Sequence, residues 1–301
     1  VVAYRTAWLK YYYPVEFMAA LITSVMGNTN SVSLYIQECK RLGIEILPPD
    51  VNESYGKFTV SNGKIRFGLM AVKNVGKALI ETIVEARKEG PFKSFTEFCQ
   101  RIENIDGTVM NKRAIESLIK AGAMESLGGN RAQFLAVFEK IMDGVHDDKK
   151  RNIQGQCSLF DSIEDKVSED NLPDLKEFPE KNLLTMEKEK LGIYISGHPL
   201  TSYEEELKKV STNTTVELFQ ISDEISEEMV GTGLRDGQKI VIGGIIVNKK
   251  NKITKNNNMM AFATLEDLYG TVEVIIFPAT YEKYQKYIEE DSIVVVEGKL
   301  S

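Results

Sequence analysis

The chain has 301 residues, which is enough for two or three domains that each have a core. Its 43% hydrophobic and 27% charged residues are typical of globular proteins, and no apolar run is long enough to span a membrane. Three scattered cysteines and two histidines lack metal-ligand spacing, so we predict reduced thiols, a cytoplasmic protein and no metal site. The chain begins Val1-Val2 and ends inside a predicted strand, so we expect it to be part of a longer protein.

The net charge of −7 is unevenly distributed along the chain. Residues 62–151 carry 16 Lys and Arg against 12 Asp and Glu, whereas residues 162–236 carry 8 against 18. Nucleic-acid binding depends on a local basic surface more than on the total charge. The acidic segment 162–236 therefore hides the positive charge of the basic segment 62–151 in the net charge of the chain.

Three helices and a small sheet are predicted for the first 67 residues. Apolar residues at helical spacing predict helices over 4–12, 14–25 and 31–41. A short strand is expected in the segment 43–47. The Asn62-Gly63 pair is a turn signal that predicts a β-hairpin over 58–67.

Residues 72–78 form a predicted tight turn that leads into an amphipathic helix. The turn requires positive φ, and Asn74 and Gly76 are the residues that adopt it at the lowest cost. The backbone N–H groups at such a helix start point outward and can bind a phosphate oxygen. The pattern resembles the helix-hairpin-helix turn of DNA-binding proteins, with Asn74 in the place of the first glycine. The alternative is an ordinary packing corner between two helices.

A second copy of this hairpin is predicted over 111–123, where Gly122 closes the first helix. Two such turns in succession favour duplex DNA over the packing alternative. The residues that we expect to contact the duplex backbone are Lys73, Asn74, Val75, Gly76, Lys77, Lys112, Arg113, Lys120 and Gly122.

A helix over 128–143, capped by Asn130, is expected to end in a flexible polar connector over 143–154. Within the following polar stretch, two adjacent large apolar residues call for a partner surface that covers them. An amide followed by such a pair can anchor in an apolar pocket. The residues of this candidate peptide are Gln156, Ser158, Leu159 and Phe160. The alternative is that the Leu-Phe pair docks on its own domain.

Residues 172–210 are acidic and predicted to be partly helical, and 210–237 reads as an acidic linker. His198 has no evident nucleophile or carboxylate pair beside it, so a turn before Pro199 is its favoured role.

From residue 239 the apolar period changes to two, which indicates strands. The predicted order is strands over 240–247, 259–266 and 271–277, a helix over 281–288 and a strand over 293–297. This is the order of an OB-fold barrel whose fifth strand would follow Ser301. A basic loop over 249–258 is expected to bind single-stranded DNA, and the alternatives are a solvated loop or a protein-binding domain. The candidate residues are Lys249, Lys250, Lys252, Lys255 and Phe262.

Several stretches resemble, in the same order, the bacterial replicative DNA polymerase III alpha subunits, which are C-family polymerases. An example is Leu-Pro-Pro-Asp-Val-Asn at 47–52. The others are 3–10, 13–20, 38–44, 65–69, 72–76, 90–94, 98–99 and 191–200. The resemblance covers essentially the whole chain.

The resemblance implies a multidomain α+β chain, mainly helical in its first two thirds and ending in an OB fold truncated before its last strand. The implied domains are the end of the polymerase fingers (1–60), a tandem helix-hairpin-helix domain (61–145), a connector with the clamp-binding peptide (146–200), an acidic linker (201–237) and the OB fold (238–301). The implied partners are duplex primer-template, single-stranded template, the sliding clamp and other replisome subunits.

The parent enzyme would add deoxynucleotides with two Mg²⁺ ions held by palm carboxylates. No closely spaced aspartate pair on a strand is present here, so we assign no catalytic residue and no cofactor to this chain. The rival interpretation is a non-enzymatic adaptor that combines hairpin and OB modules on junction or single-stranded DNA.

Overall fold

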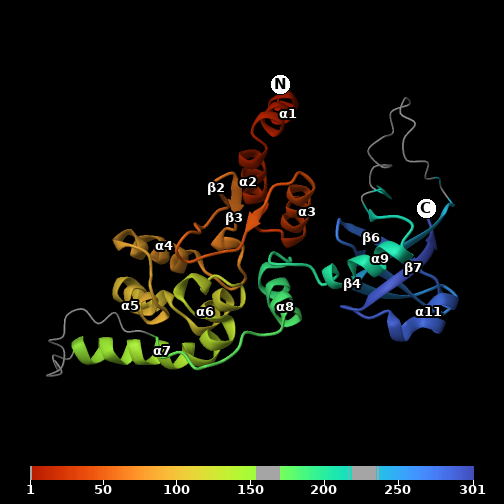
Figure 1. The fold of residues 1–301 in the computed structure, drawn as a ribbon. Helices are drawn as coiled ribbons and strands as arrows, with labels where there is room; N and C mark the ends of the chain where they lie inside the picture. The colour runs from red at the N-terminus through yellow and green to blue at the C-terminus, as the bar shows by residue number, and fades with distance from the viewer. Residues whose placement is uncertain (1, 154–169, 216, 219–234, 236) are drawn as a thin grey trace. The chain divides into compact units, whose positions relative to one another are not determined.

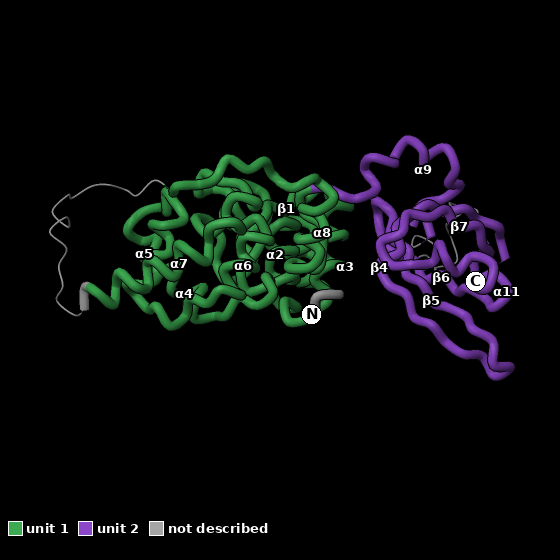
Figure 2. Tube along the Cα trace, turned by 90° about the horizontal axis from the view of Figure 1, so that it is seen from below, with its two compact units in different colours: residues 1–196 green, residues 197–301 purple. Residues whose placement is uncertain are grey.

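The computed structural model describes residues 2–153, 170–215, 217–218, 235 and 237–301 (Figure 1). The chain divides into two compact units, residues 1–196 and 197–301 (Figure 2). The finer domain boundaries given above stay predictions. Among the described residues, no helix is long and apolar enough to cross a membrane.

Unit 1 begins with three helices and a small mixed sheet. The helices are α1 (Val2–Tyr12), α2 (Pro14–Ser24) and α3 (Thr29–Arg41), as predicted. Strand β1 (Ile46–Leu47) pairs in parallel with β3 (Lys64–Arg66), and β2 (Thr59–Ser61) pairs with β3 in antiparallel orientation. Asn62 and Gly63 have φ of +50° and +75°, which confirms the predicted hairpin turn.

The hairpin region contains four helices, which are α4 (Lys77–Ala86), α5 (Phe95–Asp106), α6 (Lys112–Lys120) and α7 (Arg131–Ile153). Ser94 caps α5 by accepting a hydrogen bond from the Glu97 amide. The apolar stripes of the four helices form one core in which Phe95, Phe98 and Phe134 are fully buried. Burial of each such ring stabilises the fold by about 1.5–3 kcal/mol.

The flexible connector predicted over 143–154 is wrong as far as Ile153, because α7 continues to that residue. Met142 and Val145 still pack into the core, and His146 Nδ1 lies 3.0 Å from the buried Glu103 carboxylate. Lys149 also donates to the Glu103 backbone carbonyl. These contacts hold the polar carboxyl-terminal part of α7 against α5. The hydrophobic periodicity of the sequence does not reveal them.

The part of the acidic segment up to residue 196 belongs to the same unit. Helix α8 (Glu180–Leu191) packs with α2, α3 and the small sheet around a second core. That core also contains Val72 from the first hairpin turn, Ala121 from the second, and Leu191 with Ile193. The two predicted hairpin turns are therefore held between two hydrophobic cores.

Unit 2 contains α9 (Glu204–Val210), β4 (Lys239–Ile253), β5 (Met259–Glu266), β6 (Thr271–Ile276), α11 (Pro278–Tyr284) and β7 (Ile293–Lys299). The sheet order is β6-β5-β4-β7, with all neighbours antiparallel. This curled antiparallel sheet is consistent with the predicted OB fold (Figure 1).

The basic loop predicted over 249–258 is wrong for its first half. Residues 248–253 pair one by one with β5, so β4 and β5 form a long hairpin that projects from unit 2 (Figure 2). This part of the strand was missed because a hairpin arm that covers no core does not need alternating apolar and polar residues. The alternation that predicts a strand is therefore absent from its lysine-rich sequence. Only residues 254–258 form the turn.

Two glycines in the second hairpin provide a matched test of the packing. Gly122 has φ of +79°, and a Cβ there would lie 2.5 Å from Nη2 of the buried Arg131. Gly128 has φ of +86° with open space around it. We expect Gly128→Ala to cost about 1–2 kcal/mol of unfolding free energy from backbone strain alone. Gly122→Ala should cost about 2 kcal/mol more, because Arg131 must shift. Urea denaturation measures both, and equal losses would contradict the packing described.

Candidate nucleic-acid interface

In the first hairpin turn, the chain reverses its direction directly before α4. Asn74 has φ of +67°, as predicted, but Gly76 has φ of −78° and ψ of +151°. The positive φ predicted for Gly76 is therefore wrong. Asn74 alone makes the reversal, and Gly76 takes the extended conformation usual for the residue before a helix.

The amino end of α4 is open. Within the described chain no side chain caps it, and a Cβ at Gly76 would meet nothing within 4 Å. The first N–H groups of a helix have no acceptor inside that helix and carry a partial positive charge. Lys73 and Lys77 are exposed on either side, and Lys77 forms only a 3.5 Å surface pair with Glu81. The arrangement suits an anion.

Neighbouring helices hold this turn in place. The Asn74 side-chain amide donates to Ser117 Oγ of α6 at 3.2 Å. The Lys73 amide donates to the Lys190 carbonyl at the end of α8, at 3.0 Å. The role of α8 was missed by the sequence interpretation, which treated it as part of a connector. The apolar Leu191 and Ile193 after a charged helix were the signal that it packs.

In the second hairpin several predicted contacts already have partners. Asn111 caps α6 by accepting from the Ala114 amide at 2.8 Å. Lys112 pairs with Asp143 at 3.0 Å and Glu139 at 3.3 Å, and these hydrogen bonds raise its pKa. Lys120 pairs with Glu116 at 2.7 Å, whereas Arg113 is exposed.

Gly122 closes α6 with positive φ, as predicted, but it is buried against Arg131. The contact of Gly122 with DNA stays a prediction, and the burial of this residue does not favour it. The amino end of α7 is also occupied. The amides of Arg131 and Ala132 donate to the Glu177 carboxylate at 2.8 and 3.2 Å. The two hairpins thus differ, and the first is the more open.

On the β4–β5 hairpin, strand alternation divides the predicted lysines between two faces. Lys249 lies opposite the buried Ala263, pairs with Glu289 at 3.0 Å and lies over the Tyr281 ring. Lys250 lies opposite Phe262, on the other face. The side chain of Lys249 is only 12% exposed, which does not favour its predicted role in single-strand binding.

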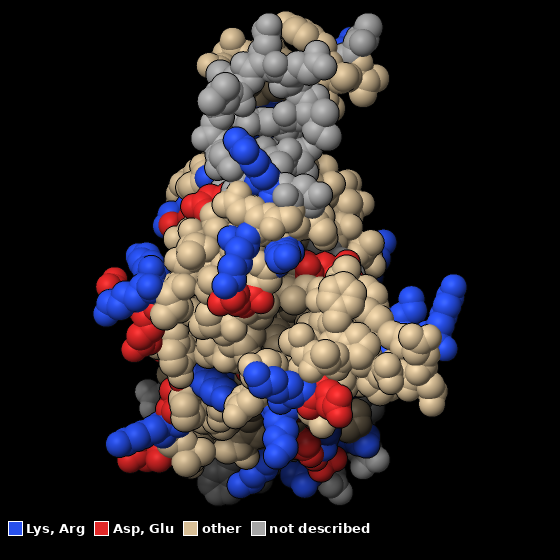
Figure 3. All heavy atoms as spheres, turned by 90° about the vertical axis from the view of Figure 1, so that its right-hand side faces the viewer, with Lys and Arg blue, Asp and Glu red and all other residues tan. Residues whose placement is uncertain are grey.

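The outward face of this hairpin combines cations with apolar side chains. Phe262 lies between Lys250 of β4 and Ile275 of β6 in register, and Lys252 Nζ lies 5.7 Å from the Phe262 ring. Lys255 is exposed in the connecting turn. The exposed apolar residues of the same region are Ile253, Met259, Ile275 and Phe277. On the face drawn in Figure 3, basic and acidic groups are interspersed, so the charge on this face does not single out a site.

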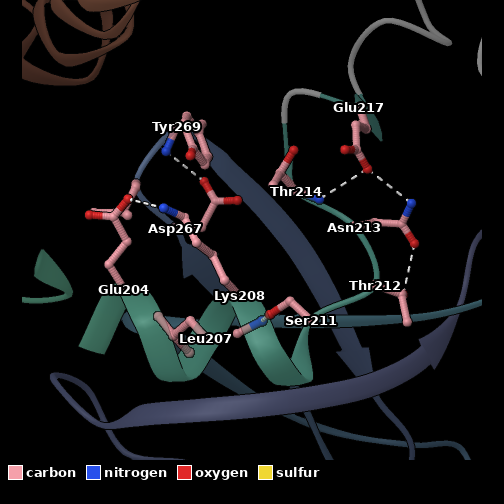
Figure 4. Close-up of a pocket in the computed structure, with 12 residues that line it drawn as sticks. Glu204, Leu207, Lys208, Ser211, Thr212, Asn213, Thr214, Glu217, Asp267 and Tyr269 are labelled. Atoms are coloured by element: carbon pink, nitrogen blue, oxygen red, sulfur yellow. Dashed lines mark hydrogen bonds and ion pairs between the residues drawn. The ribbon is translucent and has the colours of Figure 1, made fainter.

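A pocket of about 210 Å³ lies between α9 and the β5–β6 turn (Figure 4). Its polar groups bond to one another. Lys208 pairs with Glu204 at 2.7 Å, and Asp267 accepts from the Thr215 hydroxyl and the Tyr269 amide. We assign no reaction to this pocket.

His198 has the turn role predicted for it, since its Nδ1 accepts from the Leu200 amide at 3.1 Å. Cys39 and Cys99 are buried, and burial raises the pKa of Cys39 to about 12 and raises that of Cys99 further. Neither thiol is suited to nucleophilic chemistry. Among the described residues, no group of three or more His, Cys, Asp or Glu could hold a metal ion. The peptide residues Gln156, Ser158, Leu159 and Phe160 lie outside the described residues.

Two family models match the chain. A helix-hairpin-helix motif matches residues 43–134, which contain both hairpin turns. An OB-fold nucleic acid binding domain matches residues 240–301, which contain the sheet of unit 2 except for its first residue. The predicted classes of both modules are therefore confirmed.

Similar proteins match over the full chain. The DNA polymerase III subunit alpha of Saccharopolyspora erythraea is 38% identical over 100% of this chain, which covers 25% of that protein. The subunit of Escherichia coli K12 is 33% identical with the same coverage. That of Thermus aquaticus is 39% identical over 97% of this chain and 22% of its own length. The chain spans about a quarter of the length of the curated relatives it matches. Over that quarter, the chain is similar to bacterial DNA polymerase III alpha subunits.

Proposed function

We propose that this chain is the part of a bacterial replicative DNA polymerase that holds duplex and single-stranded DNA and is tethered to the sliding clamp. The observation that carries the proposal is the open amino end of α4, flanked by Lys73 and Lys77 within a helix-hairpin-helix segment. The parent protein would catalyse template-directed DNA synthesis in the cytoplasm with other replisome subunits. We expect no synthesis from this chain alone.

The proposed duplex contact is made by backbone amides and lysines. The amides of Gly76 and Lys77 would donate to a phosphate oxygen, and the Lys73 ammonium would neutralise its charge. Such contacts read no base sequence, which suits an enzyme that must copy any template. The second hairpin would contribute through Arg113, because Lys112 and Lys120 first have to release their carboxylate partners.

The single-strand contact is proposed for the outward face of the β4–β5 hairpin. Phe262 offers an aromatic ring on which a base could stack, and Lys250 and Lys252 lie where phosphates would follow. Lys255 in the turn would extend this surface. Lys249 is left out because its charge is taken up by Glu289.

The tether is proposed from the sequence of the peptide Gln156, Ser158, Leu159 and Phe160. A clamp that encircles DNA would keep the hairpins at high effective concentration near the duplex, so that a weak grip suffices between steps. Similarity to polymerase subunits along the whole of this chain supports this proposal over a non-enzymatic adaptor.

For duplex binding, we expect Lys73→Ala and Lys77→Ala each to weaken affinity about threefold to tenfold and to lower the salt slope by about one. Lys88→Ala is the matched control, because Lys88 is exposed at the opposite end of the α4 region and pairs only with Glu85. Fluorescence anisotropy with a labelled duplex at several salt concentrations measures all three. Equal losses for Lys88→Ala would point to general electrostatics and contradict the site.

For single strands, Lys252→Ala and Phe262→Leu should each weaken oligonucleotide binding several-fold, whereas Lys249→Ala should leave it unchanged. The leucine retains part of the packing of Phe262. Anisotropy with a labelled single strand gives the three affinities. A loss confined to Lys249→Ala would contradict the face proposed here, and no change in any variant would favour a protein-binding OB fold.

For the tether, the double change Leu159→Ala and Phe160→Ala should abolish binding to purified bacterial clamp and leave duplex affinity unaltered. Ile163→Ala is the control, since it removes an apolar side chain from the same segment outside the peptide. Surface plasmon resonance on immobilised clamp gives the answer. Undiminished clamp binding by the double variant would remove the peptide from the proposal.

A further inference from the structure

The end of α8 lies beside the first hairpin turn and brings a cation, Lys190, and a carboxylate, Glu189, to it. The Lys73 amide donates to the Lys190 carbonyl at 3.0 Å, and α8 packs against α6, which carries Lys120. The next residue back along α8, Glu189, accepts a hydrogen bond from Lys190 Nζ at 2.7 Å. A carboxylate is thus held at the edge of the surface that we propose for phosphate.

Nearby cations favour the ionised form of the Glu189 carboxylate. The hydrogen bond from Lys190 lowers the pKa of Glu189, and the charges of Lys190, Lys120 and Lys73 act in the same direction. Lys120 also pairs with Glu116 at 2.7 Å, and Lys73 is exposed. Glu189 is therefore a resident counter-ion for the cations around the hairpin.

The two partners of the ion pair differ in burial. The Lys190 side chain is 9% exposed, whereas that of Glu189 is 56% exposed. A nearly buried ammonium is costly without an anion beside it, so Lys190 needs a partner at all times. Glu189 can turn into solvent, but Lys190 is fixed by the packing of α8. An incoming phosphate could therefore take the place of the carboxylate.

We infer that Glu189 is a built-in competitor of the DNA backbone at the first hairpin, which weakens the duplex grip and which a phosphate displaces. This inference rests on the proposed duplex function. The competition would keep the affinity of the first hairpin for duplex low enough for the DNA to move past it. The clamp tether would prevent the protein from dissociating. A carboxylate that merely stabilises α8 would have no such effect on DNA affinity.

The test compares Glu189→Gln with Glu180→Gln in the full 301-residue chain. Glu180 lies exposed in the first turn of the same helix, so both variants change the net charge equally. We expect Glu189→Gln to bind a labelled duplex about threefold to tenfold more tightly than the unchanged chain, and Glu180→Gln to differ from it by less than about twofold. Circular dichroism melting checks that both variants are folded.

A double variant tests the mechanism. With Lys190→Met in place, Glu189→Gln should no longer tighten binding as much, because the cation that the carboxylate neutralises is gone. If Glu189→Gln binds no more tightly than Glu180→Gln, the inference is overturned while the duplex function stands. If the unchanged chain and Glu189→Gln both fail to bind duplex at low salt, the proposed function itself is overturned, and the inference with it.

Discussion

A buried ion pair between Arg131 and Glu187 joins the parts of unit 1 on which the hairpins depend. The two side chains are 5% and 2% exposed, and their closest atoms are 3.0 Å apart. Arg131 also bonds Glu125 and the Lys120 carbonyl, while Glu187 accepts the amides of Ile195 and Ser196. Loss of Arg131 would leave the buried Glu187 carboxylate without its cation, at a cost of about 3–5 kcal/mol. Because this pair fixes α8 against α6 and α7, it also fixes the Lys190 carbonyl that supports the first turn.

The two hairpins share a motif, but they differ in how many of their cations and helix-start amides already have carboxylate partners. At the first, the helix start is uncapped and the flanking lysines are exposed. At the second, Glu177 already occupies the start of α7, and Lys112 is bound by two carboxylates. A phosphate binds a helix start most readily where no side chain already accepts from its amides. The proposed duplex grip is therefore asymmetric, and it is centred on the amino end of α4.

The sequence predicted the elements well where local chemistry decides the conformation. Asn62-Gly63, the Asn130 cap of α7 and the positive φ of Asn74 and Gly122 follow from residue preferences alone, and the structure confirms each. Prediction from the sequence failed where contacts with residues far apart in the sequence determine the conformation. The continuation of α7 depends on Glu103 of another helix, and the opposite orientations of Lys249 and Lys250 depend on pairing with β5. The contribution of α8 to the first hairpin depends on a backbone hydrogen bond between residues far apart in the sequence.

The most direct test of this account is to follow the backbone amides of Gly76 and Lys77 by NMR while a short duplex is added. The account predicts that these two amides show the largest shift changes in unit 1, in the direction expected for stronger hydrogen bonding, and that the changes diminish as salt is raised. The amides of Arg131 and Ala132, which Glu177 occupies, should change less. Unchanged Gly76 and Lys77 signals in the presence of bound duplex would show that the DNA is held elsewhere and would contradict the central claim.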